Sequence, residues 1–270
     1  MSTPSASFLT FNTISRSPEL CGSGGVVCFR FENLSREQRV VHAVFSRHGG
    51  VSDPPFSTLN TSYSTGDNED RVRRNLSTVM EVMGGENFLY MHQMHGREVM
   101  VVREKDPSPF RQGAEVDAVI SDRKRLVLIV KQADCQGVLL YDPTTEVIGA
   151  AHCGWRGNVL NILGSVVDKM VTEFGCRRER MVAAIGPSLG PCCAEFIGYQ
   201  KIFPESFVAS MVRENYFDLW QISRNQLLEA GVDSANIEVS GVCTVCRRDL
   251  FFSYRGEKAS GRFATAIMLG

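Results

Sequence analysis

Short apolar runs dominate the chain between Val26 and Gly157. Each is four to eight residues long, and many are rich in β-branched residues, which favours strands over helices. They read VVCFRF, VVHAVFS, FLYMHQM, EVMVV, DAVIS, LVLIVKQA, GVLLYD and EVIGAAH, and two more, NIEVSGV and RFATAIML, lie near the C-terminus. This density predicts a substantial amount of β-sheet.

Helical spacing begins after this strand-rich part. The apolar residues of 158–175 share one face at helical spacing, which predicts a helix. Those residues are Val159, Leu163, Val166, Met170 and Phe174. Asn158 is a suitable N-cap for this helix, and Gly175 is suited to end it. Residues 218–231, which run from a capping aspartate to a glycine, predict a second helix, and residues 70–83 are a third candidate.

The first 25 residues differ in composition from the rest of the chain. They are rich in Ser, Thr, Pro and Gly, so residues 1–25 predict a loose N-terminal leader joined to the fold by a flexible turn. No internal repeat, low-complexity tract or linker follows residue 25. A chain of 270 residues can form one unit, so residues 26–270 are expected to be a single domain.

Composition and charge narrow the classes of partner. With 43% hydrophobic and 22% charged residues, the chain resembles ordinary globular proteins. A formal net charge of -1 supplies no phosphate-neutralising patch, so we expect no nucleic-acid partner, although a nucleotide-sized ligand stays open. We see no export signal and no membrane-spanning stretch. The nine cysteines are odd in number and irregularly spaced, which favours reduced thiols in a cytoplasmic protein.

Reactive side chains lie beside small residues at the ends of three predicted strands. The segments are HQMHG at 92–96, KQADCQGVLLYD at 131–142 and GAAHCGWRGN at 149–158. Zinc binds imidazole nitrogen and thiolate sulfur, and three protein ligands leave a fourth position open. His95, Cys135 and His152 can supply such a site, although their spacing matches no short metal motif. Alternatively, Cys135 is a small buried apolar residue and His152 a hydrogen-bonded core residue.

Other charged residues are candidates for catalysis or anion binding. Asp134 follows a very apolar strand, where a carboxylate is costly to bury unless it is paired or functional; the alternative is a turn-capping aspartate. Arg47 and His48 precede two glycines and Arg156 precedes one, a combination that suits an anion such as phosphate. The alternative is that these are surface side chains near turns.

The remaining cysteines give weaker signals. Cys243 and Cys246 form a lone C-x-x-C, which we interpret as fortuitous without a second pair. Cys192 and Cys193 are interpreted as loop cysteines. Cys153, beside a candidate ligand, can be reactive if the site is electropositive.

Seven motifs together resemble the laccase-domain family, also called multicopper polyphenol oxidase or purine nucleoside phosphorylase family proteins. They are SRHGGVS at 46–52, QMHG at 93–96, VDAVIS at 116–121, ADC at 133–135, AAHCGWRG at 150–157, IGPSLGPCC at 185–193 and FFSYRGEKASGR at 251–262. The resemblance runs from about residue 40 to the C-terminus. The chain departs from the pattern at His92, Cys153 and Gly256, where Asn, Ala and Arg are common, and these departures bear on substrate preference.

The resemblance implies both a fold and a metal centre. The fold is α+β, a single compact domain of mixed β-sheets layered with helices. The implied metal ligands are His95, Cys135 and His152, the positions that match the family's Q-x-H-G, A-D-C and A-H-x-G-W-R-G motifs.

A laccase mechanism needs more histidines than this chain has. A multicopper oxidase combines an electron-transfer copper with a trinuclear cluster bound by paired H-x-H motifs. The chain has five histidines and no H-x-H. We therefore expect Zn2+ at the site, with Cu2+ possible at the same ligands.

Members of the family are implicated in purine nucleoside chemistry: phosphorolysis of adenosine, inosine and methylthioadenosine, and hydrolytic deamination of adenosine. In deamination, zinc would activate water for attack on C6 and Asp134 would shuttle the proton. In phosphorolysis, Arg47 would hold phosphate against ribose C1′ while an acid protonates the departing purine. The expected partners are nucleosides and phosphate.

Two rival functions remain at this point. The first is a metal-free cysteine hydrolase with Cys135 as nucleophile and a histidine as base, acting on peptidoglycan precursors, because similar proteins are linked to peptidoglycan editing. The second is a non-enzymatic scaffold with a structural zinc, which would need a fourth ligand such as His92 or Cys153. We expect His92 to lie in the second shell of the metal instead.

Overall fold

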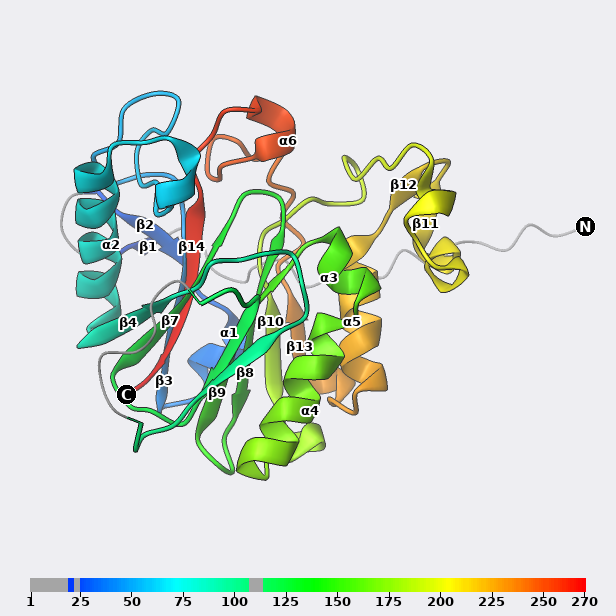
Figure 1. The fold of residues 1–270 in the computed structure, drawn as a ribbon, viewed down its shortest axis with the longest axis horizontal. Helices are drawn as coiled ribbons and strands as arrows, with labels where there is room; N and C mark the ends of the chain where they lie inside the picture. The colour runs from blue at the N-terminus through cyan, green and yellow to red at the C-terminus, as the bar shows by residue number, and fades with distance from the viewer. Residues whose placement is uncertain (1–18, 22–24, 107–113) are drawn as a thin grey trace, which may run out of the picture.

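Two six-stranded sheets pack face to face, and helices cover their outer faces (Figure 1). The structure is a computed structural model that describes residues 19–21, 25–106 and 114–270. In these residues the layers run helix, sheet, sheet, helix. The arrangement confirms the α+β class of mixed sheets layered with helices.

The first sheet has the order β1-β2-β3-β14-β7-β4. Its strands are β1 (Glu19–Leu20), β2 (Val27–Phe29), β3 (Val40–Phe45), β14 (Phe263–Leu269), β7 (Leu126–Gln132) and β4 (Asn87–Tyr90). The β4–β7 pair is parallel and the other pairs are antiparallel. Because β4 and β7 are parallel, the segments that follow them leave the same edge of the sheet.

The second sheet has the order β13-β10-β8-β9-β6-β5. Its strands are β13 (Ile237–Val239), β10 (Val182–Ile185), β8 (Gln136–Asp142), β9 (Val147–Cys153), β6 (Ala118–Ser121) and β5 (Val99–Val102). The β10–β13 and β5–β6 pairs are parallel. β10 is absent from the predicted strands, because its sequence VAAI shows neither alternation nor rich β-branching.

Alternation along the strands builds the core between the layers. Leu128 and Val130 of β7 face the second sheet, while Val127 and Ile129 face the outer helix of the first. In β8 the same two-residue period divides side chains between the two sides of the second sheet. Every residue of β7, β8, β9 and β14 is buried. These four strands therefore form a rigid centre for any site at their ends.

Three long helices cover the sheets. Helix α2 (Glu69–Met83) packs on the first sheet, while α4 (Ile162–Phe174) and α5 (Leu219–Glu229) pack on the second. The predictions for α2 and α5 are confirmed, including the Asp218 cap, whose side chain accepts from the Gln221 N–H.

The helix predicted over residues 158–175 is wrong at its start. A short helix, α3 (Trp155–Val159), comes first, and Asn161 rather than Asn158 caps α4. Asn161 adopts a left-handed backbone with φ of 53°, which interrupts the helical path, and its side chain accepts the Gly164 N–H. Asn158 is instead buried and donates to Ser223.

Short elements complete the described chain. They are α1 (Glu32–Ser35), α6 (Tyr254–Glu257), the hairpin of β11 (Met211–Arg213) and β12 (Tyr216–Phe217), and the 3-10 turns Tyr63–Thr65, Arg178–Arg180, Tyr199–Lys201, Glu205–Ser210 and Ser234–Asn236. Around the hairpin, Phe196, Phe203, Phe207 and Phe217 form a separate aromatic cluster. This cluster forms a small lobe beside α5 (Figure 1).

Most of the predicted leader, residues 1–18 and 22–24, lies outside the described residues. Its described part is attached to the fold: Glu19 and Leu20 pair with β2, and Cys21 forms a disulfide with Cys28. For this pair the prediction of reduced thiols is wrong, because the β1–β2 pairing brings the two cysteines together. A cytoplasmic location stays a prediction.

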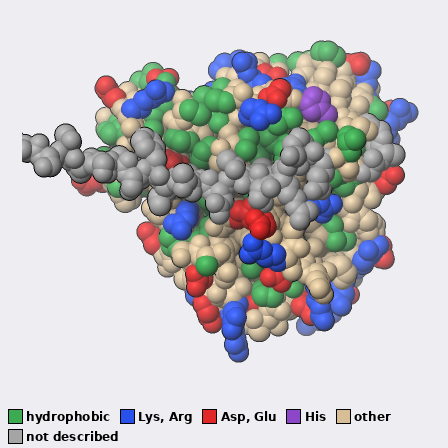
Figure 2. All heavy atoms as spheres, turned by 180° about the vertical axis from the view of Figure 1, so that it is seen from behind, with side chains coloured by type: hydrophobic (Ala, Val, Ile, Leu, Met, Phe, Trp, Pro, Cys, Tyr) green, Lys and Arg blue, Asp and Glu red, His purple; other side chains and the backbone are tan. Residues whose placement is uncertain are grey.

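None of the described helices is both long and apolar enough to cross a bilayer. On the face shown in Figure 2, basic and acidic side chains are interspersed rather than segregated.

Candidate metal centre

The chain crosses from the first sheet to the second between β7 and β8, and Cys135 lies in this connection. On the neighbouring strand β9, His152 lies opposite Gly137, close to the start of β8. His95 comes from the segment after β4, which leaves the first sheet at the same edge as the end of β7. The structure thus brings the donor atoms of His95, Cys135 and His152 within 4.8 Å of one another.

One buried carboxylate, that of Asp117, holds both histidines. Its Oδ1 accepts a hydrogen bond from His152 Nδ1 at 2.8 Å and from the His95 backbone N–H at 2.9 Å. Its Oδ2 accepts the backbone N–H groups of Gly96 at 2.6 Å and Met94 at 3.1 Å. Because Nδ1 of His152 is engaged, Nε2 is left to face a metal, as in carboxylate–histidine–zinc arrangements. The sequence prediction gave Asp117 no role, although the motif VDAVIS contains it.

Two residues of the site have backbone conformations that are unfavourable for non-glycine residues. The φ angle is 60° at His95 and 82° at Asp134. Such conformations cost on the order of 1–3 kcal/mol and persist where the surroundings hold them. The Asp117 carboxylate holds the first, and a hydrogen bond of 2.8 Å from the Leu189 N–H to the Asp134 carbonyl helps to hold the second. Strain of this kind clusters at functional sites.

Electrostatic interactions ionise Cys135. Burial raises the pKa of its thiol, but the charge of His152 and hydrogen bonds from His152 and His95 outweigh burial and lower the pKa to about 6. Burial lowers the pKa of His152, but the Cys135 thiolate and Asp117 raise it to about 9. The thiolate therefore predominates at neutral pH, and the thiolate is the form that binds metals or acts as a nucleophile.

The donor set fits a zinc ion. Bonds of about 2.3 Å to sulfur and 2.0–2.1 Å to nitrogen put the two donors about 3.6 Å apart in a tetrahedral site. Cys135 Sγ lies 3.8 Å from His95 Nε2. Among the described residues this group contains three donors, which leaves an open position as in catalytic zinc sites. His92 is exposed and Cys153 contacts Ser223, and neither belongs to the group.

Gly154 makes room for these ligands. A Cβ at this position would lie 2.8 Å from Cys135 Sγ and 3.2 Å from His95 Cδ2, whereas its φ of -84° suits any residue. Steric crowding, and not the backbone conformation, therefore disfavours a side chain at position 154. We expect Gly154→Ala to weaken zinc binding by about 10-fold or more, the scale of a disturbed ligand shell, in a competition assay with a chromophoric chelator.

Gly149→Ala is the matched control, because Gly149 lies in β9 and its added Cβ would approach no atom closer than 3.4 Å. Equal zinc affinity in the two variants would show that Gly154 does not limit the ligand cluster.

His95, Cys135 and His152 line a cavity of about 600 Å³. This volume is in the range of sites for small organic ligands. Its wall combines aromatic rings, cations and amides: Trp155, Phe196 and Tyr254; Lys131, Arg255 and Arg262; and Gln93, Gln132 and Gln136.

Two of these cations have no carboxylate partner among the described residues, although buried charges usually have one. Lys131 Nζ donates to the Met91 carbonyl at 2.8 Å, and burial, together with the nearby charge of Arg262, lowers its pKa to about 7. Arg262 donates through Nη1 to the carbonyls of Ser260 and Gly261, and neither Nε nor Nη2 donates to a described residue. An anion near Arg262 would offset the unfavourable burial of these charges.

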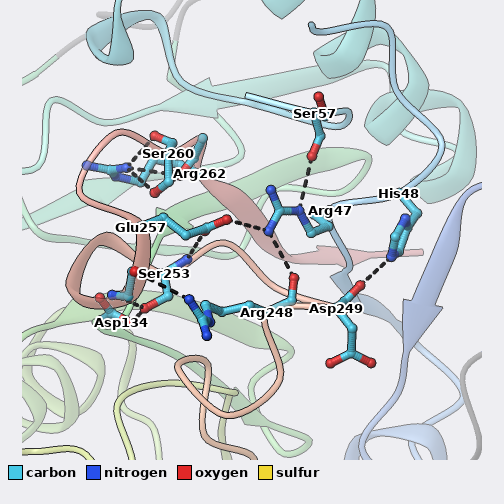
Figure 3. Close-up of polar contacts among 12 residues, drawn as sticks. Arg47, His48, Ser57, Asp134, Arg248, Asp249, Ser253, Glu257, Ser260 and Arg262 are labelled. Carbon is cyan, nitrogen blue, oxygen red and sulfur yellow. Dashed lines mark hydrogen bonds and ion pairs between the residues drawn. The ribbon is translucent and has the colours of Figure 1, made fainter. Parts of the chain in front are cut away.

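The cations suggested by the sequence for phosphate lie elsewhere. Arg47 donates to two backbone carbonyls and to the Glu257 carboxylate at 2.8 Å, and His48 hydrogen-bonds to the Asp249 carbonyl (Figure 3). Arg156 is exposed. None of the three lines the cavity described above. The structure therefore gives no support to their predicted phosphate contacts and instead puts Arg262 and Lys131 in the cavity wall.

Asp134 lines the cavity and is hydrogen-bonded to the segment that runs from the end of β13 into α6, where Ser253 is one partner (Figure 3). Its Oδ1 accepts hydrogen bonds from Thr244 Oγ1 and Ser253 Oγ, each at 2.7 Å, and its Oδ2 accepts the Arg255 backbone N–H at 2.6 Å. These contacts indicate a positioning role. Its predicted proton transfer stays a prediction, as does the predicted second-shell role of His92.

Two relatives of the chain are named purine nucleoside phosphorylase. A purine nucleoside phosphorylase of Bacteroides thetaiotaomicron is 33% identical over 88% of this chain and 95% of its own length. The purine nucleoside phosphorylase YfiH of Escherichia coli is 31% identical over 83% of this chain and 91% of its own.

Solved structures show the same fold. The YlmD crystal structure from Geobacillus stearothermophilus superposes with a TM-score of 0.81 at 28% identity, over 92% of this chain and 97% of that one. A hypothetical protein YfiH from Bacillus licheniformis gives 0.81 at 29% identity, over 90% and 96%. The family model described as multi-copper polyphenol oxidoreductase laccase matches residues 41–270. The chain therefore belongs to the multi-copper polyphenol oxidoreductase laccase family.

Proposed function

We propose that the chain is a zinc-dependent purine nucleoside phosphorylase that cleaves adenosine, inosine and methylthioadenosine, and that it also deaminates adenosine. The observation that carries the proposal is a single cavity in which a thiolate–imidazole donor set lies together with Arg262 and Lys131. The names of the relatives from Bacteroides thetaiotaomicron and Escherichia coli support the substrate class.

Phosphorolysis requires an anion site and a proton donor. A phosphate oxygen bonds to ribose C1′ as the C1′–N9 bond breaks, and the purine leaves with the bonding electrons and takes up a proton. Arg262 offers Nε and Nη2 to the phosphate. Lys131, with a pKa of about 7, is suited to protonate the departing base. Trp155 and Tyr254 provide ring surfaces for the purine in the same wall.

The metal would be held by His95, Cys135 and His152. When bound, zinc supplies Lewis-acid character that stabilises negative charge and activates water, which deamination requires. Asp134 is the proposed proton carrier for deamination. Copper(II) at the same ligands is the alternative metal.

Arg262→Gln tests the anion site. Loss of a charge-assisted hydrogen bond costs about 1.5–3 kcal/mol, so we expect the KM for phosphate to rise about 10-fold or more, with a smaller change in the KM for inosine. Steady-state assays at varied phosphate measure both constants. Arg156→Gln is the control, because this exposed arginine does not line the cavity. An unchanged KM for phosphate in Arg262→Gln would locate the anion site elsewhere.

One observation supports a second candidate, a cysteine hydrolase acting on peptidoglycan precursors. The Cys135 thiolate, His152 and Asp117 form a nucleophile–base–carboxylate series. Such an enzyme would keep its activity in a chelator and lose it to a thiol alkylator, whereas the proposed phosphorylase loses its activity in the chelator. A scaffold with structural zinc fits less well, because the group of described donors at this site has three members rather than four.

A further inference from the structure

Four cysteines outside the metal centre converge in space. Cys192 and Cys193 lie on the loop after β10, and Cys243 and Cys246 lie on the loop after β13. The two strands are parallel neighbours, so both loops leave the same edge of the second sheet. Their four sulfur atoms lie within 4.8 Å of one another. Sequence spacing does not predict this cluster, because the two pairs are about 50 residues apart and only one has C-x-x-C spacing.

Backbone contacts hold the two loops together independently of the sulfurs. The Ser188 N–H donates to the Val242 carbonyl at 3.1 Å, and the Thr244 N–H donates back to Ser188 at 3.0 Å. At Gly190 the approach is so close that an added Cβ would lie 2.9 Å from Cys243 Cβ. The convergence of the cysteines is therefore fixed by the sheet and by a glycine.

The spacing and number of the sulfurs fit a tetrahedral metal ion. Zinc–sulfur bonds of about 2.3 Å place tetrahedral thiolates about 3.8 Å apart. Cys246 Sγ lies 3.6 Å from Cys192 Sγ and 3.7 Å from Cys193 Sγ. Structural zinc sites are closed by four protein ligands, whereas the centre at Cys135 has three. We propose that Cys192, Cys193, Cys243 and Cys246 bind a second, structural zinc ion.

This site would fasten one wall of the cavity. Thr244, which lies between Cys243 and Cys246, donates a hydrogen bond to Asp134. Arg255 of α6 donates to the carbonyls of Cys193 and Glu195 at 3.2 and 2.7 Å. Phe196, in the same loop as Cys193, lines the cavity. A zinc ion here would add a cross-link at the far ends of loops that backbone contacts already join near the sheet, and its loss is expected to change substrate binding more than the chemical step.

The test removes the first metal site and then counts zinc. Protein carrying Cys135→Ala, purified with reductant from zinc-containing medium, is expected to hold about one zinc per chain by elemental analysis. Adding Cys246→Ser, an exposed position, should reduce that to a small fraction, and adding Cys192→Ser should do the same. Adding Cys176→Ser is the control and should leave the zinc in place, because Cys176 lies outside both groups.

Cobalt(II) provides a readout independent of activity. In the Cys135→Ala background a tetrathiolate site gives intense thiolate-to-cobalt absorption, which Cys246→Ser should abolish. The proposal is overturned if Cys135→Ala protein holds no zinc, or if its zinc survives both Cys246→Ser and Cys192→Ser. Iron as the bound metal, or a Cys192–Cys246 disulfide in peptide mapping of protein purified with reductant, would overturn it equally.

Discussion

Cys135→Ala is expected to remove the zinc of the open site and to lower the rate of nucleoside cleavage by more than about 100-fold. This loss exceeds the 10–100-fold that is typical when a residue hydrogen-bonded to a metal ligand is replaced. The thiolate is the only sulfur donor of this group and the only anionic one, so two histidines remain to hold the ion. Phosphorolysis assays and elemental analysis on one preparation measure both effects. Because Cys135 is only partly buried, the fold should survive.

Cys176→Ser is the control for the loss of a thiol as such, since Cys176 is buried away from the site against Thr145. Full activity in Cys135→Ala would rule out Cys135 both as a metal ligand and as the nucleophile of the rival hydrolase.

Asp117→Asn is expected to weaken zinc binding by about 10–100-fold, because a carboxylate hydrogen-bonded to a ligating histidine fixes the orientation of its ring. The carboxylate accepts four hydrogen bonds, from His152 Nδ1 and from the N–H groups of Met94, His95 and Gly96. An amide has one oxygen, and its NH2 group would face donors. The positive φ at His95 would then lose part of its support.

Chelator competition measures the affinity, and Asp122→Asn is the control. Asp122 follows the opposite end of β6 and accepts the Glu104 N–H instead. If Asp117→Asn bound zinc as tightly as wild type, the histidines would be positioned without this carboxylate.

Apolar patterning was sufficient for most of the fold. The β-rich runs correspond to strands β2 to β9, and α2 and α5 end close to their predicted limits. β10 was missed because VAAI has little pattern. The start of α4 was misplaced because either of two asparagines could serve as a cap, and the left-handed backbone at Asn161 decides between them.

The site depended more on tertiary contacts. The three candidate ligands could be selected by resemblance, but Asp117 could not, because its nearness to His152 arises from the pairing of β6 with β9. In the sequence, Arg47 stands beside glycines with no acidic residue next to it, which suggested an anion site. In the fold it forms an ion pair with Glu257, which lies about 200 residues further along the chain. The four-cysteine cluster escaped notice for the same reason: neighbouring strands, not sequence spacing, bring its halves together.

Phosphorolysis can be distinguished from hydrolysis by analysing the products of inosine incubated with the protein as purified, with and without phosphate. A zinc-dependent phosphorylase is expected to release free hypoxanthine and ribose 1-phosphate only when phosphate is present, to form neither after chelator treatment, and to form both again when zinc is added. Cleavage that needs no phosphate, or that continues unchanged in chelator, would contradict a zinc-dependent phosphorylase at His95, Cys135 and His152.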